Sequence, residues 1–198
     1  GKWTHKGAWQ YAYDFVKTDN NKLTYKNKGN NLEDYYCYKQ NVLSPVRGRV
    51  IKVISDLPDN PIKAVNTSHN WGNIVTIQDI FGNYILLAHF AKDSLKVKTG
   101  DWIEPGDLLG LCGNSGYSPQ PHIHIQVQAT AETGSATFPF KFIHYSESNE
   151  YNSKGLPDIS SVITNSAPIP FYDQLTTFIL DEVYTFDVLK SGIPKDSF

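Results

Sequence analysis

Residues 110–128 read GLCGNSGYSPQPHIHIQVQ, and the fold can be built outward from this stretch. A glycine-rich turn and a proline-bounded loop lead into HIHIQVQ (residues 122–128), where polar and apolar residues alternate. Such alternation is typical of a half-buried β-strand. Imidazoles two residues apart on a strand are separated by about 7 Å, so one could bind a metal ion while the other faces whatever the metal holds. One face of this strand would carry His122, His124, Gln126 and Gln128.

The rest of the chain reads as further strands that could pair with this one. Short apolar runs bounded by Gly, Pro, Asn and Asp predict strands, and FGN (residues 81–83) between two of them predicts a β-hairpin. Residues 18–34, 56–73 and 146–158 are polar and predict loops. Because no stretch of the body shows a sustained helical period, we predict an all-β fold. The predicted strands are 11–16, two within 42–55 around a turn at Arg47 and Gly48, 74–80, 84–90, 95–97, 102–103, 108–111, 122–128 and 138–145.

Composition limits the class of protein. The chain has 198 residues, of which 40% are hydrophobic and 19% charged, as expected for an ordered globular domain. The net charge of -2 gives no electrostatic case for binding nucleic acid or an anionic membrane, and no apolar run approaches the roughly 20 residues of a membrane span. Two cysteines, Cys37 and Cys112, are too few for a disulfide framework and leave a single bridge or two thiols open. There is no methionine, so we expect a processed or trimmed chain whose signal peptide would not be visible.

Five segments follow one another in a specific order: SPVRGRV (44–50), WGNIVTI (71–77), YILLAHF (84–90), VKTGDWIEPGDLLGLCGNSG (97–116) and PHIHIQV (121–127). Each segment alone is a weak signal, but the set in this order resembles zinc metallopeptidases of the lysostaphin and LytM type, peptidase family M23. The resemblance covers about residues 42–128 and extends back to YAYDF (11–15). It implies a mostly antiparallel β fold, a half-open barrel–sandwich hybrid related to the duplicated hybrid motif, with long loops and a C-terminal extension. The expected division is a metallopeptidase-like domain at 1–145 and an extension at 146–198 that packs on it.

The resemblance also implies the site. His124 matches a zinc ligand, Asp14 matches the carboxylate ligand, and His89 and His122 match a catalytic pair. The first ligand departs from the family pattern, because the usual H-x-x-x-D spacing would place Gln10 at that position. The nearest histidine is His5, in an H-x8-D spacing, and we take it as the first ligand. Two other histidines, His69 and His144, could replace His5 but are expected to be structural.

This ligand set would suit a catalytic zinc ion, which keeps three protein ligands and leaves a position for water. The two remaining histidines titrate near neutrality and could move the protons of hydrolysis. Asn114 and Ser115 are expected to shape the turn before the H-x-H strand, with substrate contact as a secondary role. From the resemblance we predict an extracytoplasmic zinc endopeptidase that cleaves peptide bonds in bacterial peptidoglycan, and we expect it to be a monomer.

Two other classes compete with this prediction. A catalytically degenerate relative could bind peptidoglycan or a partner enzyme without cleaving it, and the missing H-x-x-x-D favours that class. A carrier or phosphotransfer domain of related β architecture could explain LSPVRGRV and VKTGDWIEPGDLL. A phosphotransfer domain would leave Asp14 and PHIHIQV without a purpose. A biotinyl or lipoyl carrier needs a lysine between small residues or methionines at a hairpin tip, and this chain has no methionine.

Overall fold

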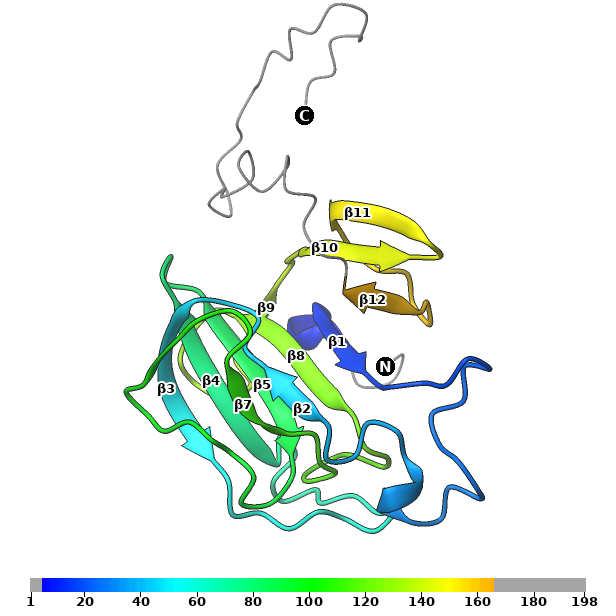
Figure 1. Cartoon of the computed structure of the whole chain (residues 1–198). Coiled ribbons are helices and arrows are strands. Elements are labelled where there is room, and N and C mark those ends of the chain that lie inside the picture. The colour runs from blue at the N-terminus through cyan, green and yellow to red at the C-terminus, as the bar shows by residue number, and fades with distance from the viewer. Residues whose placement is uncertain (1–4, 166–198) are drawn as a thin grey trace, which may run out of the picture.

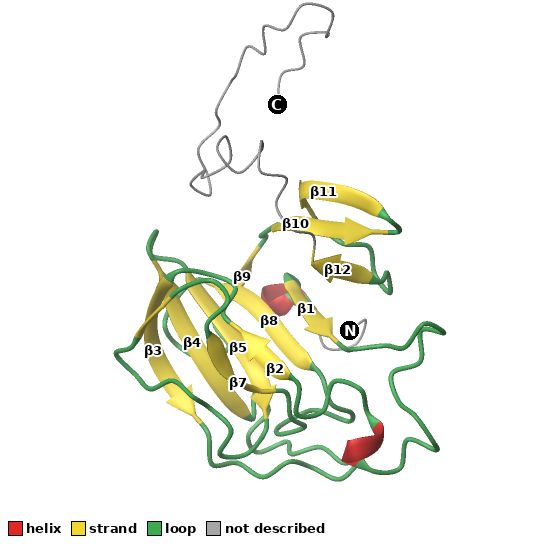
Figure 2. Ribbon diagram, in the orientation of Figure 1, coloured by secondary structure: helices red, strands yellow, loops and turns green. Residues whose placement is uncertain are grey.

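The computed structural model describes residues 5–165, and nearly all regular structure in this part of the chain is β-strand (Figure 2). Two short 3-10 helices, η1 (Gly7–Trp9) and η2 (Leu32–Asp34), accompany the strands. The strands are β1 (Ala12–Phe15), β2 (Asn41–Leu43), β3 (Gly48–Ile54), β4 (Asn73–Asp79), β5 (Tyr84–Phe90), β6 (Trp102–Ile103), β7 (Leu108–Leu111), β8 (Ile123–Gln128), β9 (Thr137–Phe138), β10 (Phe142–Glu147), β11 (Glu150–Gly155) and β12 (Ile163–Asn165). The prediction of an all-β, mostly antiparallel fold is confirmed.

The largest sheet places β8 between two strands that come from distant parts of the chain. Its order is β1-β8-β5-β4-β3-β6, and β9 also pairs with β8 (Figure 1). All the recorded strand pairs are antiparallel. In this register His124 lies opposite Asp14 of β1 on one side and Ala88 of β5 on the other. The topology therefore brings the H-x-H strand, the N-terminal carboxylate and the end of β5 together.

Each face of this sheet carries an apolar cluster. On one face, aliphatic side chains such as Val75, Leu87 and Ile125 pack against Leu109 of β7, which forms a two-stranded sheet with β2. Figure 1 shows β2 and β7 lying across the large sheet. On the other face, a small cluster of Ile74, Leu86 and Ala88 packs against Trp71.

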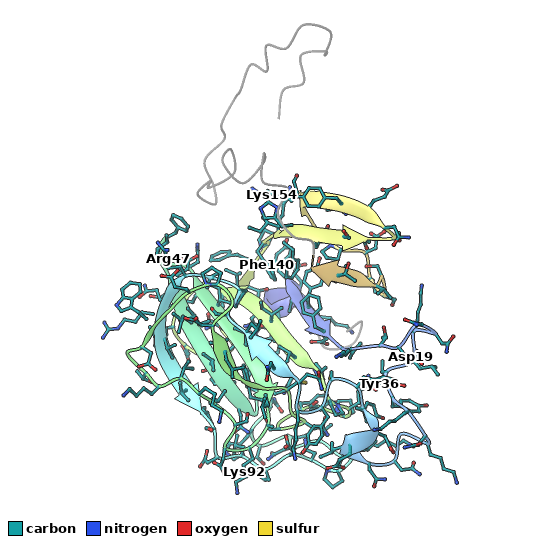
Figure 3. All side chains as sticks on the ribbon, viewed as in Figure 1. Asp19, Tyr36, Arg47, Lys92, Phe140 and Lys154 are labelled. Atoms are coloured by element: carbon teal, nitrogen blue, oxygen red, sulfur yellow. The ribbon has the colours of Figure 1, made fainter. Side chains whose placement is uncertain are left out.

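A three-stranded sheet of order β11-β10-β12 follows the main sheet. It is joined to β1 by aromatic contacts, because Phe142 of β10 lies 5.1 Å from Tyr13 and 5.4 Å from Phe15 between ring centroids. Phe140, labelled in Figure 3, packs on the same group at 5.9 Å from Tyr13. The chain after β9 is thus anchored on the outer side of β1.

Three predictions about local structure were wrong. Residues 95–97 form a loop, in which Leu95 and Val97 still pack against the core. Residues 138–145 hold the end of β9 and the start of β10 rather than one strand, and the predicted loop at 146–158 contains the end of β10 and all of β11. The sequence EYNSKG of β11 lacks apolar alternation, so its strand form comes from pairing with β10.

Strand β10 runs across residue 145, where the extension was expected to begin. The remainder of that extension, residues 166–198, lies outside the described residues, and the division into 1–145 and 146–198 stays a prediction. Cys37 and Cys112 are buried free thiols whose Sγ atoms are 3.3 Å apart. No helix among residues 5–165 is long and apolar enough to cross a membrane.

Candidate metal and catalytic site

The pairing of β1 with β8 places a carboxylate beside an imidazole. Asp14 and His124 are partners in the antiparallel register. Their side chains lie on the same face, with Asp14 Oδ1 2.9 Å from His124 Nδ1. Directly paired residues on neighbouring strands point to the same side of a sheet, so the strand register alone accounts for this contact.

His5 reaches the same carboxylate through a folded connection. After His5 the chain forms η1 and is held against the segment near β9, where the Trp9 indole N–H donates to the Gly134 carbonyl at 2.6 Å. Thr137 Oγ1 accepts from the Tyr11 amide at 3.1 Å and donates to a carbonyl of the same connection. His5 Nε2 then lies 3.4 Å from Asp14 Oδ1. The eight residues between the two expected ligands therefore fold back so that both side chains approach the same point.

The three expected ligands form a cluster. One ligand atom each from His5, Asp14 and His124 lie within 4.8 Å of one another. His122 is close as well, with its Nε2 3.8 Å from Asp14 Oδ1. Partial burial by itself raises the pKa of the Asp14 carboxyl, but the close approach of ring nitrogens of His124 and His5, and of His122, lowers that pKa far below its usual range. The carboxylate is therefore ionised, as a metal ligand must be.

A β-bulge brings His89 to this face. In the β4–β5 pairing Asn73 lies opposite Phe90 and Ile74 opposite Ala88, so His89 is an extra residue without a partner. Its φ of 71° is in the left-handed region, which a non-glycine residue rarely adopts. Simple alternation would turn His89 to the same face as Leu87, but the bulge re-aims it. Its ring lies 4.6 Å from that of His122 between centroids.

Hydrogen bonds fix the tautomers of this histidine pair. His89 Nδ1 lies 2.7 Å from the Ser115 carbonyl, and His122 Nδ1 lies 2.9 Å from the Gln120 carbonyl. A carbonyl oxygen can only accept, so in both rings Nδ1 carries the proton and Nε2 carries a lone pair. Burial lowers the pKa of His89 well below its ordinary value and lowers the pKa of His122. Both rings are therefore neutral bases at neutral pH.

The two turn residues are fully buried. Asn114 donates from its side chain to the Asn60 carbonyl and accepts from Ser118, while Ser115 Oγ bonds the Asn73 amide and the Phe90 carbonyl. These bonds fit the expected role of shaping the turn, and the Ser115 carbonyl also orients His89. Direct substrate contact by Asn114 or Ser115 stays a prediction.

The other two histidines lie elsewhere. His69 is exposed in the loop before β4, and His144 Nδ1 lies 2.6 Å from the hydroxyl of Tyr151 in the three-stranded sheet. The structure also adds residues to which the sequence analysis gave no role. Trp71 packs edge-on against His124 at 5.4 Å between centroids, and Gln126 continues the histidine face of β8. The signals that pointed to these two residues were the WGNIVTI segment and the unbroken polar face of HIHIQVQ.

The donor atoms of the cluster fit a metal ion. Two imidazole nitrogens and one carboxylate oxygen converge, a donor set that suits zinc in a catalytic site with one open position. Asp14 Oδ1 has nitrogen atoms of three histidines within 3.8 Å, more than a single stabilising ion pair requires. The residues present therefore fit a bound divalent metal.

Comparison with known proteins places this chain in a family. The model for peptidase family M23 matches residues 27–137. The chain belongs to this family. The match contains His89, His122 and His124 of the site, whereas His5 and Asp14 precede it.

Curated relatives of this M23 chain include an uncharacterized metalloprotease of Buchnera aphidicola subsp. Baizongia pistaciae (strain Bp), 36% identical over 74 residues, which are 37% of this chain and 19% of the relative. Another is the L-Ala--D-Glu endopeptidase of Bacillus subtilis (strain 168), 31% identical over 88 residues, 40% of this chain and 27% of the relative. The chain thus spans about a quarter or less of the length of these relatives. Among solved structures, the antimicrobial peptidase lysostaphin from Staphylococcus simulans matches with a TM-score of 0.44 and 18% identity, covering 68% of this chain and 43% of that one.

Proposed function

We propose that this M23 chain is a zinc-dependent endopeptidase that cleaves peptide bonds in bacterial cell-wall peptidoglycan. The observation that carries the proposal is the convergence of His5, Asp14 and His124 within 4.8 Å, beside two neutral imidazoles. A zinc ion held by these residues would polarise the scissile carbonyl and lower the pKa of a bound water.

The chain's own residues would hold and move the protons. Nε2 of His122 is the best-placed base, because it carries a lone pair and lies 3.8 Å from the ligand atom of Asp14. It would take a proton from the attacking water and return it to the amine that leaves. The ring of His89 lies 4.6 Å from that of His122 between centroids, and its Nε2 would share the proton that His122 takes from the water, so that an N–H can face the negative charge that develops on the carbonyl oxygen.

The substrate class rests on the relatives. The Bacillus subtilis relative is named for cleaving an L-Ala–D-Glu bond. We therefore propose a peptide of the cell wall as the substrate of this chain. Such a substrate requires action outside the cytoplasmic membrane, so an extracytoplasmic location follows from the proposal. We further propose that the chain acts as a monomer and binds no nucleic acid, in line with its net charge of -2.

A non-cleaving binding module is the competing function. The feature in its favour is the missing H-x-x-x-D spacing, but His5 lies 3.4 Å from Asp14 and would supply the first ligand by another route. A carrier or phosphotransfer domain would leave the clustering of Asp14 with His122 and His124 without a purpose. The enzyme accounts for all five residues.

The test is release of new amino termini from purified peptidoglycan. We expect release by the zinc-loaded chain, loss of release after a chelator, and recovery when zinc is added back. His69→Ala is the matched control, because it removes an exposed histidine outside the cluster and should change neither zinc content nor release. Stoichiometric zinc and binding to peptidoglycan without any new amino termini would contradict the enzyme and support the binding module.

A further inference from the structure

The polar face of β8 continues past the histidines as a chain of buried hydrogen bonds. His124 Nε2 lies 3.0 Å from Gln126 Oε1, and Gln126 Nε2 donates to Gln128 Oε1 at 2.9 Å. Gln128 Nε2 then donates to the carbonyls of Thr130 and Glu132, both at 2.8 Å. Gln126 is fully buried and Gln128 is 1% exposed, so water does not compete for these bonds.

The direction of this chain is set at its far end. The carbonyl oxygens of Thr130 and Glu132 can only accept, so the atom of Gln128 that faces both of them must be its NH₂ group. Oε1 of Gln128 is then the acceptor for the NH₂ of Gln126. This leaves Oε1 of Gln126 facing His124, whose Nε2 must carry the proton. Two backbone carbonyls thereby determine the tautomer of an imidazole several residues away.

This tautomer matters on the other side of the ring. In a neutral imidazole with a proton on Nε2, Nδ1 has a lone pair. That lone pair points at Asp14 Oδ1, 2.9 Å away, which is also an acceptor. Two acceptors face each other at hydrogen-bond distance, an arrangement that a cation between or beside them stabilises. The other tautomer would place a proton on Nδ1 and satisfy Asp14 without any metal.

We propose that Gln126 and Gln128 are positioning residues that hold His124 in the tautomer with a proton on Nε2, so that Nδ1 is presented to the metal. This inference rests on the proposed function in taking zinc as the metal. Ligating histidines commonly donate their second N–H to an oriented acceptor, and loss of that acceptor costs about 10–100-fold in metal affinity. The two glutamines therefore prevent the metal-free protein from closing the site with an internal hydrogen bond.

The test compares Gln126→Leu, Gln128→Leu and a matched control. Thr76→Val is the control, because Thr76 is also fully buried and its hydroxyl has no hydrogen-bond partner among residues 5–165. Thr76 pairs with Leu86, which in turn pairs with Gln126 across the sheet. Two quantities are measured for each folded variant: the tautomer of His124 in the metal-free protein by nitrogen-15 NMR, and the zinc affinity by competition with a chelator.

We expect Gln126→Leu to move the proton to Nδ1 and to weaken zinc binding about 10–100-fold. Gln128→Leu should give a smaller loss of zinc affinity, because the amide of Gln126 could then present either its oxygen or its NH₂ group to His124. Thr76→Val should match the parent in both quantities. A purely structural role for the glutamines would lower thermal stability and leave the tautomer on Nε2.

The inference and the proposed function fail in different ways. If the parent binds zinc while both leucine variants keep the Nε2 tautomer and the parental zinc affinity, the role given to the glutamines is wrong and the proposed enzymatic function is unaffected. If the parent binds no zinc, the proposed function is wrong. The His124 tautomer in metal-free Gln126→Leu and Gln128→Leu then still tests whether the glutamines set that tautomer. If Gln126→Leu does not fold, Gln128→Leu is the only test variant. An unchanged His124 tautomer and an unchanged zinc affinity in Gln128→Leu would then overturn the role given to the glutamines.

Discussion

The two faces of β8 are both buried but differ in what surrounds them. One face carries Ile123 and Ile125, which pack into the main apolar core and line a cavity of about 710 Å³. The other carries His124, with His122 directly before the strand, and the ring nitrogens of both histidines have polar neighbours. The lining of this cavity includes none of the five proposed ligands and bases, so the cavity lies apart from the proposed chemistry.

This difference separates stability from chemistry on a single strand. Aliphatic side chains stabilise the fold in proportion to the apolar surface they bury. Buried histidines and amides stabilise it little, because each hydrogen bond replaces one made to water. Substitutions on the apolar face should therefore change the free energy of unfolding, and substitutions on the polar face should change metal content and turnover.

The largest expected effect is that of His124→Ala. It removes one of the three proposed ligands and leaves Asp14 with fewer imidazole neighbours. We expect zinc content near zero and no measurable release of amino termini, measured by elemental analysis and amine assay. Zinc content equal to the parent's would show that His124 is not a ligand. It would also contradict the proposal that the polar face of β8 serves metal binding while the apolar face serves stability.

His122→Ala should separate the two histidines of the H-x-H motif. Its ring is proposed as a base and not as a ligand, so the variant should keep about one zinc per chain. Loss of a general base typically lowers turnover about 10²–10⁴-fold. His89→Ala should behave in the same way, as measured by kcat beside zinc content. If either variant lost zinc as readily as His124→Ala, the assigned roles would be wrong.

Ile125→Ala tests the opposite face. Removing a buried isoleucine from a core usually costs about 2–5 kcal/mol, and Ile125 is only 7% exposed. We expect a fall of this size in the free energy of unfolding, measured with urea, while the folded variant keeps its zinc. A variant with normal stability but reduced zinc would show that the two faces are not separable.

The smallest expected effect lies outside β8, at Asp34 in η2. A hydrogen bond from Asn27, followed by one from the Asn31 amide, lowers the pKa of this carboxyl. A carboxyl whose pKa is lower in the folded state stabilises the fold above its unfolded pKa of about 3.9, and that contribution is lost as pH falls through the folded pKa. Asp34→Asn should therefore lower the urea midpoint slightly at pH 7 and flatten its decline below about pH 4. A change in zinc content in this variant would contradict the proposal that the metal depends on the cluster of His5, Asp14 and His124.

The fold was largely predictable because its strands carry local signals. The alternation in HIHIQVQ, the FGN turn and the short apolar runs are read within a few residues, and they gave the strands that frame the site. The sequence analysis did not predict strand β11, because EYNSKG has no apolar alternation and forms a strand through its pairing with β10.

The site was predictable to the level of residues but not of geometry. The resemblance named His89, yet a period of two would send its side chain into the apolar core. The bulge that turns it toward His122 depends on an unpaired residue against β4, which no local pattern shows. The route of His5 to Asp14 likewise depends on contacts of η1 with residues more than 100 positions away, such as that of Trp9 with Gly134.

The most direct test of the account is zinc content per chain in the parent beside His5→Ala, after purification without chelator. We expect about one zinc in the parent and little in the variant, because a site with two remaining protein ligands binds the ion weakly. One zinc in both would show that His5 is not a ligand and that the first ligand is another histidine. A parent that takes up no zinc even when it is supplied would contradict the central claim that the polar face of β8 is half of a metal centre.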